Sequence, residues 1–270
     1  MFLKMLYAVI YGDLLMICYN KCRAYELVKG SALKKLNKWQ KILGNIFAKG
    51  SSEYLRTKSI YSQILEDFGR IELSNVKKIR VGIVGEIYVK YSPLANNHLE
   101  DFLISENCEP VVPTLLEFVM YCACGNMTDG KLYDHVTKSS VVNGIGYKLI
   151  YSKQKELINV MKKNGKFDPP HDFEHLRHLA DKYINQGVVM GEGWLIPAEM
   201  ASLVESGVEN IISAQPFGCL PNHIVAKGMA RKIKSAYPNA NIVAIDYDAG
   251  ATRVNQENRI KLMIANARSV

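Results

Sequence analysis

Cysteine is scarce in this sequence, and the number and spacing of its cysteines exclude a disulfide-stabilised domain and a zinc ribbon. Six cysteines in 270 residues are too few for a fold held together by disulfides, and no secretory signal is evident. Reduced thiols and a cytoplasmic location are therefore expected. The cysteines also lack the CxxC…CxxC pattern of a zinc ribbon. The glycine-bearing stretches GVVMGEGW and VNGIGYK match neither the dinucleotide fingerprint nor the P-loop.

Long unbroken apolar runs are missing as well. Lys4 and Asp13 interrupt the apolar stretch at residues 1–20, whereas a bilayer-spanning helix needs about 20 consecutive apolar residues. No membrane partner is therefore expected. The spacing instead predicts a helix buried almost all round. One apolar face carries Leu3, Leu6, Ile10, Leu14 and Ile17. The other carries Met5, Val9 and Met16. We expect this helix to pack under the helices that follow or at an oligomer contact, and the chain to be part of a longer protein.

The remaining composition is that of a globular protein with a basic balance. The chain is 48% hydrophobic and 22% charged, with a net charge of +8 and a pI near 9.0. This excess could favour an acidic partner such as a phosphorylated cofactor or nucleic acid. Nucleic acid is disfavoured, because no known motif is present and aromatic residues do not interleave with the basic run KGSALKKLNKWQKILGNIFAKG. The lysines of this run are interpreted as the solvated face of an amphipathic helix.

The order of helical and strand-like segments predicts an α/β fold. Residues 1–75 read as a helical region. Short β-branched runs at 80–86, 110–112, 209–214 and 241–246 then alternate with helices, around a helical insertion at about 125–190. Such alternation implies right-handed crossovers and a parallel sheet covered on both faces. The sequence therefore predicts a doubly wound, flavodoxin- or Rossmann-like sheet of about four strands within residues 76–270.

Polar side chains gather where these strands end. In open α/β sheets, ligands bind at the carboxyl ends of the strands. The candidate rim residues for a substrate or cofactor are Glu86, Glu192, Gln215, Asp246 and Asp248. Aspartate and glycine are also common in such turns for capping alone. The sequence therefore predicts a shared edge and leaves open whether it is a functional site.

Cys219 is the sharpest candidate at this edge. In QPFGCLPNH it stands between Pro216 and Pro221, just before a predicted helix whose free N–H groups and dipole favour a thiolate. Thiolates are soft ligands suited to iron–sulfur clusters. The alternative is a structural cysteine under a loop. The helical pairs Cys18 with Cys22 and Cys122 with Cys124 are expected in the core, and Cys108 stands alone before a turn.

The chain resembles one protein family over nearly its whole length. The resemblance is carried by the motifs QPFGCLPNH and DYDAGATRVNQENRIKLM, by GEGWLIPAEM, and by the upstream stretch VGIVGEIYVKYSPLANNHLEDFLISENCEPVVPTLLEFVMYC. The sequence is similar to the C-terminal part of the large CoA-substrate-specific enzyme activases, which are related to 2-hydroxyacyl-CoA dehydratases. The resemblance implies an N-terminal ATPase activator in longer members, followed by a dehydratase-like region. It also implies an iron–sulfur cluster held by cysteines, to which ATP drives electrons for a radical dehydration of an acyl-CoA.

On this resemblance, Cys219 is a late-contributed cluster ligand. The ATPase domains and the cysteine-bearing start of the dehydratase-like region have no counterpart in this chain, and one thiolate cannot hold a cubane. The resemblance therefore predicts a chain without activity of its own, whose cluster is present only once the other regions or a partner subunit are added. An alternative stays open, in which the chain is a metal-free binding or docking module for a CoA-like ligand or a protein.

Overall fold

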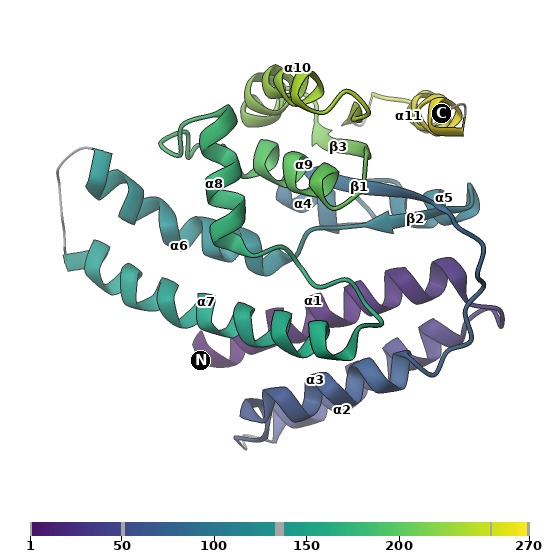
Figure 1. Cartoon of the computed structure of the whole chain (residues 1–270), viewed down its shortest axis with the longest axis vertical. Coiled ribbons are helices and arrows are strands. Elements are labelled where there is room, and N and C mark those ends of the chain that lie inside the picture. The colour runs from purple at the N-terminus through teal and green to yellow at the C-terminus, as the bar shows by residue number, and fades with distance from the viewer. Residues whose placement is uncertain (1, 50–51, 133–137, 249, 269–270) are drawn as a thin grey trace.

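The computed structural model describes residues 2–49, 52–132, 138–248 and 250–268, which form a sheet and a surrounding set of helices (Figure 1). The strands are β1 (Ile79–Gly85), β2 (Cys108–Val111), β3 (Asn210–Pro216) and β4 (Asn241–Tyr247). The elements before β1 are α1 (Phe2–Tyr25), α2 (Ser31–Ala48), the 3₁₀ turn η1 (Glu53–Leu55) and α3 (Thr57–Phe68). Those between β1 and β3 are α4 (Ile87–Tyr91), α5 (Leu99–Ser105), α6 (Leu115–Leu132), α7 (Lys138–Asn164), α8 (Phe173–Tyr183) and α9 (Leu195–Glu205). The later ones are the π-helical turn η2 (Pro221–Ala226), α10 (Lys227–Ala236) and α11 (Arg253–Arg268).

The sheet confirms the predicted fold class. Its strands run parallel in the order β2-β1-β3-β4, and the four predicted strand segments coincide with them to within a few residues. Apolar side chains of α5 and α11 pack on one face of the sheet, and those of α9 and α10 pack on the other. Coverage on both faces explains why the strands are nearly continuous apolar runs without alternation. The fold is therefore doubly wound.

Gly85 ends β1 in a conformation that only glycine adopts readily. Its φ is +129°, and a Cβ at this position would lie 1.9 Å from the carbonyl oxygen of Ala214 on β3. The backbone of β1 thus turns away from the sheet in direct contact with β3. This close approach sets the position from which Glu86 and α4 continue.

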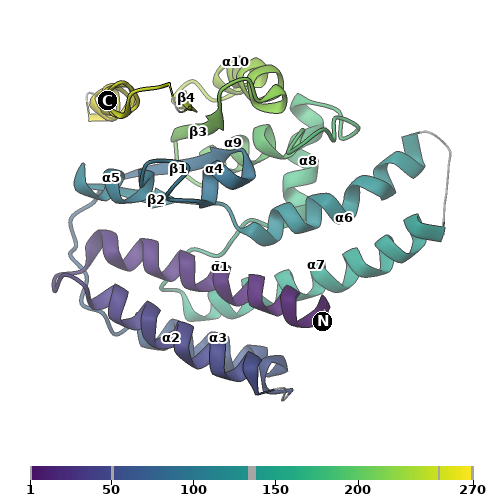
Figure 2. The same ribbon diagram turned by 180° about the vertical axis from the view of Figure 1, so that it is seen from behind.

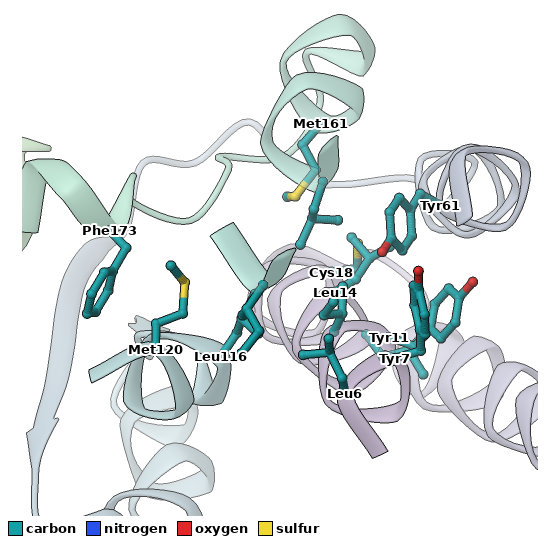
Figure 3. Packing of buried hydrophobic residues seen from close by; sticks show 14 of the residues in the cluster. Leu6, Tyr7, Tyr11, Leu14, Cys18, Tyr61, Leu116, Met120, Met161 and Phe173 are labelled. Atoms are coloured by element: carbon teal, nitrogen blue, oxygen red, sulfur yellow. The ribbon is translucent and has the colours of Figure 1, made fainter. Parts of the chain in front are cut away.

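The N-terminal helix α1 lies against α2, α3 and α6 rather than in solvent (Figures 1 and 2). Ile10 and Leu14 are fully buried, and Figure 3 shows Leu14 among side chains from several helices. The prediction that α1 packs with the basic helices is confirmed. The helix is buried along most of its length, but Leu3 and Met5, predicted on its apolar faces, are 44% and 58% exposed in its first turn.

The helices that precede the sheet share one core with those inserted between β2 and β3. Figure 3 shows Tyr11 of α1 and Tyr61 of α3 in the same cluster as Met120 of α6, Met161 of α7 and Phe173 of α8. A helical layer beneath the sheet therefore contains α1, α2, α3, α6 and α7, with α1 nearer the sheet than α2 and α3. Helix α8 rises from this layer beside the sheet (Figures 1 and 2). The division of the chain at residue 75 stays a prediction. Within the described residues, no helix combines the length and apolar character that a membrane crossing requires.

Candidate functional site

The carboxyl ends of β1, β3 and β4 lie side by side at one edge of the sheet. Gln215 of β3 pairs with Asp246 of β4, and the backbone N–H of Glu86 donates to the Ala214 carbonyl at 3.0 Å. Cys219 follows shortly after the end of β3. The structure therefore brings these predicted residues to one edge, which we call the carboxyl edge.

Asp246 is surrounded by polar groups at the carboxyl edge. The side-chain amide of Gln215 donates to Oδ1 of Asp246 at 2.6 Å, and Nζ of Lys227 lies 3.7 Å from the same oxygen. Nε2 of His223 lies 3.3 Å from that oxygen, and its Nδ1 lies 3.0 Å from Nζ of Lys227. Both ring nitrogens of His223 therefore face a polar group. The backbone N–H of Gly218 also donates to Nε2 at 3.2 Å, so the ring is held in place from several sides.

Cys219 stands at the entry to η2. Its backbone N–H donates to the Pro216 carbonyl at 3.3 Å, and its own carbonyl accepts from the N–H of His223 at 2.9 Å. The side-chain amide of Asn222 lies 3.2 Å from Sγ and donates to it. The thiol is partly exposed, so it is both held in place and accessible. π-Helical turns of this kind occur frequently at functional sites.

Two buried oxygens beside Cys219 have no donor within the described part of the chain. Oε1 of Gln215 and Oδ1 of Asn222 both belong to side chains that are fully buried, and neither has a hydrogen-bond partner there. A buried acceptor without a donor costs about 1–3 kcal/mol. Both side chains use their amide nitrogens, Gln215 toward Asp246 and Asn222 toward Cys219. Their oxygens are covered by the surrounding chain, so this hydrogen-bonding capacity is unmet inside the carboxyl edge.

The other predicted rim residues have local roles. Glu86 caps α4 by accepting from the N–H of Val89 at 2.8 Å, and Glu192 accepts from the N–H of Ile87 at 3.0 Å. These carboxylates satisfy backbone donors at the first turn of α4, as capping residues do. Asp248 is exposed in the turn after β4. Glu192 and Glu86 therefore support the backbone at the carboxyl edge.

Large apolar side chains near Cys219 are exposed. Phe217, Leu220 and Ile224 are 72%, 53% and 62% exposed. These three, which we call the apolar rim, lie within a few residues of the thiol on either side. Exposed apolar groups gathered around a polar centre are typical of a surface that another molecule covers.

Comparison with known proteins gives no family for this chain. No protein-family model matches it, and neither a curated protein nor a solved structure does. The function proposed below therefore rests on the motifs of the sequence and on the geometry of the carboxyl edge.

The remaining thiols do not gather around Cys219. Cys18 and Cys22 are fully buried in α1, which confirms their prediction as core residues, and Cys108 is buried in β2. The prediction is correct for Cys124 and wrong for Cys122, which is exposed, because residues two apart on a helix point to different sides. Within the described ranges, no group of three or more His, Cys, Asp or Glu side chains could hold a metal ion. Cys219 thus stands at the carboxyl edge outside any such group in the described part of the chain.

A second polar group, which the sequence reasoning missed, lies between the sheet and the helical layer. Nζ of Lys90 lies 2.9 and 3.2 Å from the two carboxylate oxygens of Glu199, and both side chains are 1% exposed. Asp13 accepts the N–H groups of Leu115 and Leu116 at 2.9 Å each, at the start of α6. Together with Glu117, a further buried side chain on α6, these residues form what we call the buried acidic cluster: Asp13, Lys90, Glu117 and Glu199.

Burial dominates the chemistry of the acidic cluster. Desolvation raises the pKa of Asp13 to about 7, and the two backbone N–H groups and Lys90 oppose this rise. Desolvation and the nearby Glu199 raise the pKa of Glu117 well above its usual range, against the influence of Lys90. Desolvation also raises the pKa of Glu199, although Lys90 opposes it. The cluster therefore contains more carboxyl groups than its single lysine can balance.

Only part of this chemistry left a signal in the sequence. Asp13 is visible as an acidic residue inside an apolar helix, and Lys90 as a lone charge in IYVKY. His223 and Lys227 are four residues apart, which places both on one side of a helix that follows β3. Glu117 is likewise the one charge in the apolar run TLLEFVMYC, although its contacts depend on the packing of α6 against other elements.

Proposed function

We propose that this chain supplies one thiolate ligand, Cys219, and one wall of an iron–sulfur or acyl-CoA site that another region or subunit completes. The protein would be related to 2-hydroxyacyl-CoA dehydratases and their activases, and would act in the cytoplasm. The observation that carries the proposal is the position of Cys219. Its thiol is partly exposed at the carboxyl edge, fixed by backbone hydrogen bonds, and contacted by a side-chain amide. Hydrogen bonds to sulfur are one of the means by which proteins tune such clusters.

The site requires further ligands from elsewhere. An iron–sulfur cluster is generally held by about four ligands, nearly all thiolates, whereas the carboxyl edge supplies one. The apolar rim next to Cys219 is a feature that a covering protein surface would satisfy. The completing part would be an N-terminal ATPase activator with its cysteine-bearing region, or a separate subunit. By itself, this chain would be neither ATPase nor dehydratase.

The charge at the carboxyl edge is compatible with an acyl-CoA ligand. Lys227 is exposed beside Asp246, and the chain has a net charge of +8. Positive charge near a binding edge raises the local concentration of phosphate-bearing ligands.

A metal-free docking module is the second candidate, and the apolar rim favours it. Phe217, Leu220 and Ile224 would bury apolar area against a partner whether or not a metal is present. In that case Cys219 would be a structural thiol, and the partner would bind without iron.

The experiment compares iron and inorganic sulfide in the longer protein or complex that contains this chain, purified without oxygen. We expect wild-type protein to be brown and Cys219→Ser to lose most of its iron and sulfide. Circular dichroism should show an unchanged fold, because the thiol is partly exposed. Cys122→Ser is the matched control, since Cys122 is an exposed cysteine in the interior of α6. Equal iron in wild type and Cys219→Ser would reject Cys219 as a ligand, and a colourless wild type would favour the docking module.

A further inference from the structure

A cleft of about 420 Å³ opens on the side of the sheet where α1, β2 and the start of α6 meet. The segment that follows α7 forms its opposite wall, with Phe167 and Asp168 among the lining residues. The lining includes neither Cys219 nor the residues around Asp246. The cleft is therefore a site separate from the carboxyl edge, and its volume is in the range typical of small-molecule pockets.

The walls of the cleft are largely apolar and rigid. Ile17, Val112, Phe167 and Leu203 contribute apolar side chains. Four prolines also line the cleft, at positions 110, 113, 169 and 170. Each proline ring fixes the backbone φ, so this part of the wall loses little freedom when a ligand binds. An apolar body of moderate size fits such walls.

The polar wall of the cleft presents acceptors without donors. Glu117 is 1% exposed and lines the cleft, and neither of its carboxyl oxygens meets a donor at hydrogen-bond geometry in the described residues. The Thr114 hydroxyl is near enough to oppose its raised pKa in part. Oδ1 of Asn20, also buried and on the same cleft, likewise has no donor among the residues described. A ligand that matches this wall must bring hydrogen-bond donors.

The ionisable groups around Glu117 are predominantly carboxyl groups, and burial favours their protonated forms. Asp13 and Glu199 raise the pKa of Glu117 further, and Lys90 opposes them while bonded to Glu199. A positive group next to Glu117 would therefore favour its ionised form as well as fill a hydrogen-bonding gap.

The cations on the cleft wall do not supply that positive group. Lys21 lies 3.1 Å and Arg80 3.5 Å from Glu109, and Arg80 also lies 2.8 Å from Asp168. Lys162 lines the cleft but is exposed at its rim, where water screens its charge. Among the described residues, Glu117 therefore forms no salt bridge, and Lys90, the lysine of the acidic cluster, is paired with Glu199.

We propose that this cleft binds a small organic ammonium, a primary amine on an apolar body, with its ammonium group donating to the carboxylate of Glu117. An ammonium brings three donors and no acceptor, which matches a wall of acceptors. A neutral alcohol brings one donor and no charge, and a carboxylate adds a further negative charge to the acidic cluster. On binding, the proton that Glu117 holds passes to solvent, and the resulting carboxylate pairs with the bound cation.

The test measures binding of three six-carbon probes to the full chain by isothermal titration calorimetry near neutral pH. The probes are n-hexylammonium, hexan-1-ol and hexanoate, which share an apolar body and differ in the head group. We expect n-hexylammonium to bind at least tenfold more tightly than the other two. Equal or tighter binding of hexan-1-ol or hexanoate, or no binding of n-hexylammonium, would overturn the proposal.

Three variants locate the interaction. Glu117→Gln keeps the side-chain size and removes the charge, so it should weaken n-hexylammonium binding at least tenfold. Glu66→Gln, on the exposed face of α3, is the matched control and should bind like wild type. Ser206→Trp places a large ring at an exposed lining position and should block binding even if Glu117→Gln fails to fold. Unchanged binding in a folded Glu117→Gln, or in Ser206→Trp, would place the amine elsewhere and reject the proposed site.

Discussion

The carboxyl edge and the buried acidic cluster hold similar residues in opposite environments. At the edge, the Lys227–Asp246 pair is separated by 3.7 Å, and its side chains are 38% and 27% exposed. In the cluster, the Lys90–Glu199 pair is separated by 2.9 Å, and both side chains are 1% exposed. Water stabilises each charge at the edge separately, whereas the charges in the cluster depend on one another. Similar ion pairs should therefore differ greatly in what their loss does to the protein.

The largest expected effect comes from breaking the buried pair. Lys90→Met should lower the free energy of unfolding by about 3–5 kcal/mol, because it leaves Glu199 buried without its counter-charge. Urea unfolding followed by circular dichroism measures the change. The double variant Lys90→Met with Glu199→Leu should recover most of the loss, since an apolar pair can replace a buried ion pair. A loss below about 1 kcal/mol in the single variant would mean that the cluster is as well solvated as the edge.

A second effect is pH-dependent and arises from Asp13. Its pKa in the folded protein is about 7, above the usual 3.8, so between these values the folded state holds a proton that the unfolded state has released. The stability that Asp13 contributes is complete below its usual pKa of 3.8 and is lost as the pH rises through its folded-state pKa of about 7. Asp13→Asn cannot ionise. It should therefore gain stability relative to wild type, on the order of 4 kcal/mol, as the pH rises from about 4 to about 8.

The measurement is urea unfolding of both proteins at several pH values, taken as the difference between them. This difference largely removes the contributions of Glu117 and Glu199, which are present in both proteins. Asn also keeps one oxygen that can accept from the first turn of α6. A difference that does not change with pH would show that Asp13 is solvated in the folded state.

The smallest effect should come from the edge. Lys227→Met removes the partner of Asp246 and of His223, yet it should change the free energy of unfolding by less than about 1 kcal/mol. Water can replace the lost contact, because both side chains of the pair are partly exposed. The same urea titration measures it. A loss as large as that for Lys90→Met would remove the contrast between the two regions.

The contrast also explains what the sequence could predict. The carboxyl edge follows from local pattern, because the ends of parallel strands meet wherever β-branched runs alternate with helices, as with Glu86, Gln215 and Asp246. The contacts of His223 and Lys227 with Asp246 depend on how the helix after β3 is rotated, which the pattern does not determine. Glu117 and Lys90 are buried by helices distant in the sequence, so neither composition nor spacing reveals their environment.

Cys122 illustrates the same limit on a smaller scale. The apolar character of TLLEFVMYCACG predicts a buried helix, and most of α6 before Cys124 follows that prediction. Exposure of Cys122 depends on which side of α6 meets the helical layer at that point. A hydrophobic segment thus predicts a buried helix without specifying the side on which each residue lies.

The packing of α1 has a consequence for synthesis of the chain. Leu14 of α1 shares a core with Leu116 of α6 and Met161 of α7, which the ribosome adds much later (Figure 3). At about 5–20 residues per second, the apolar face of α1 waits on the order of ten seconds for these partners. Tyr61 of α3 can cover only part of that face in the meantime. We therefore expect nascent chains to bind a ribosome-associated chaperone through α1, and to release it once α7 has emerged.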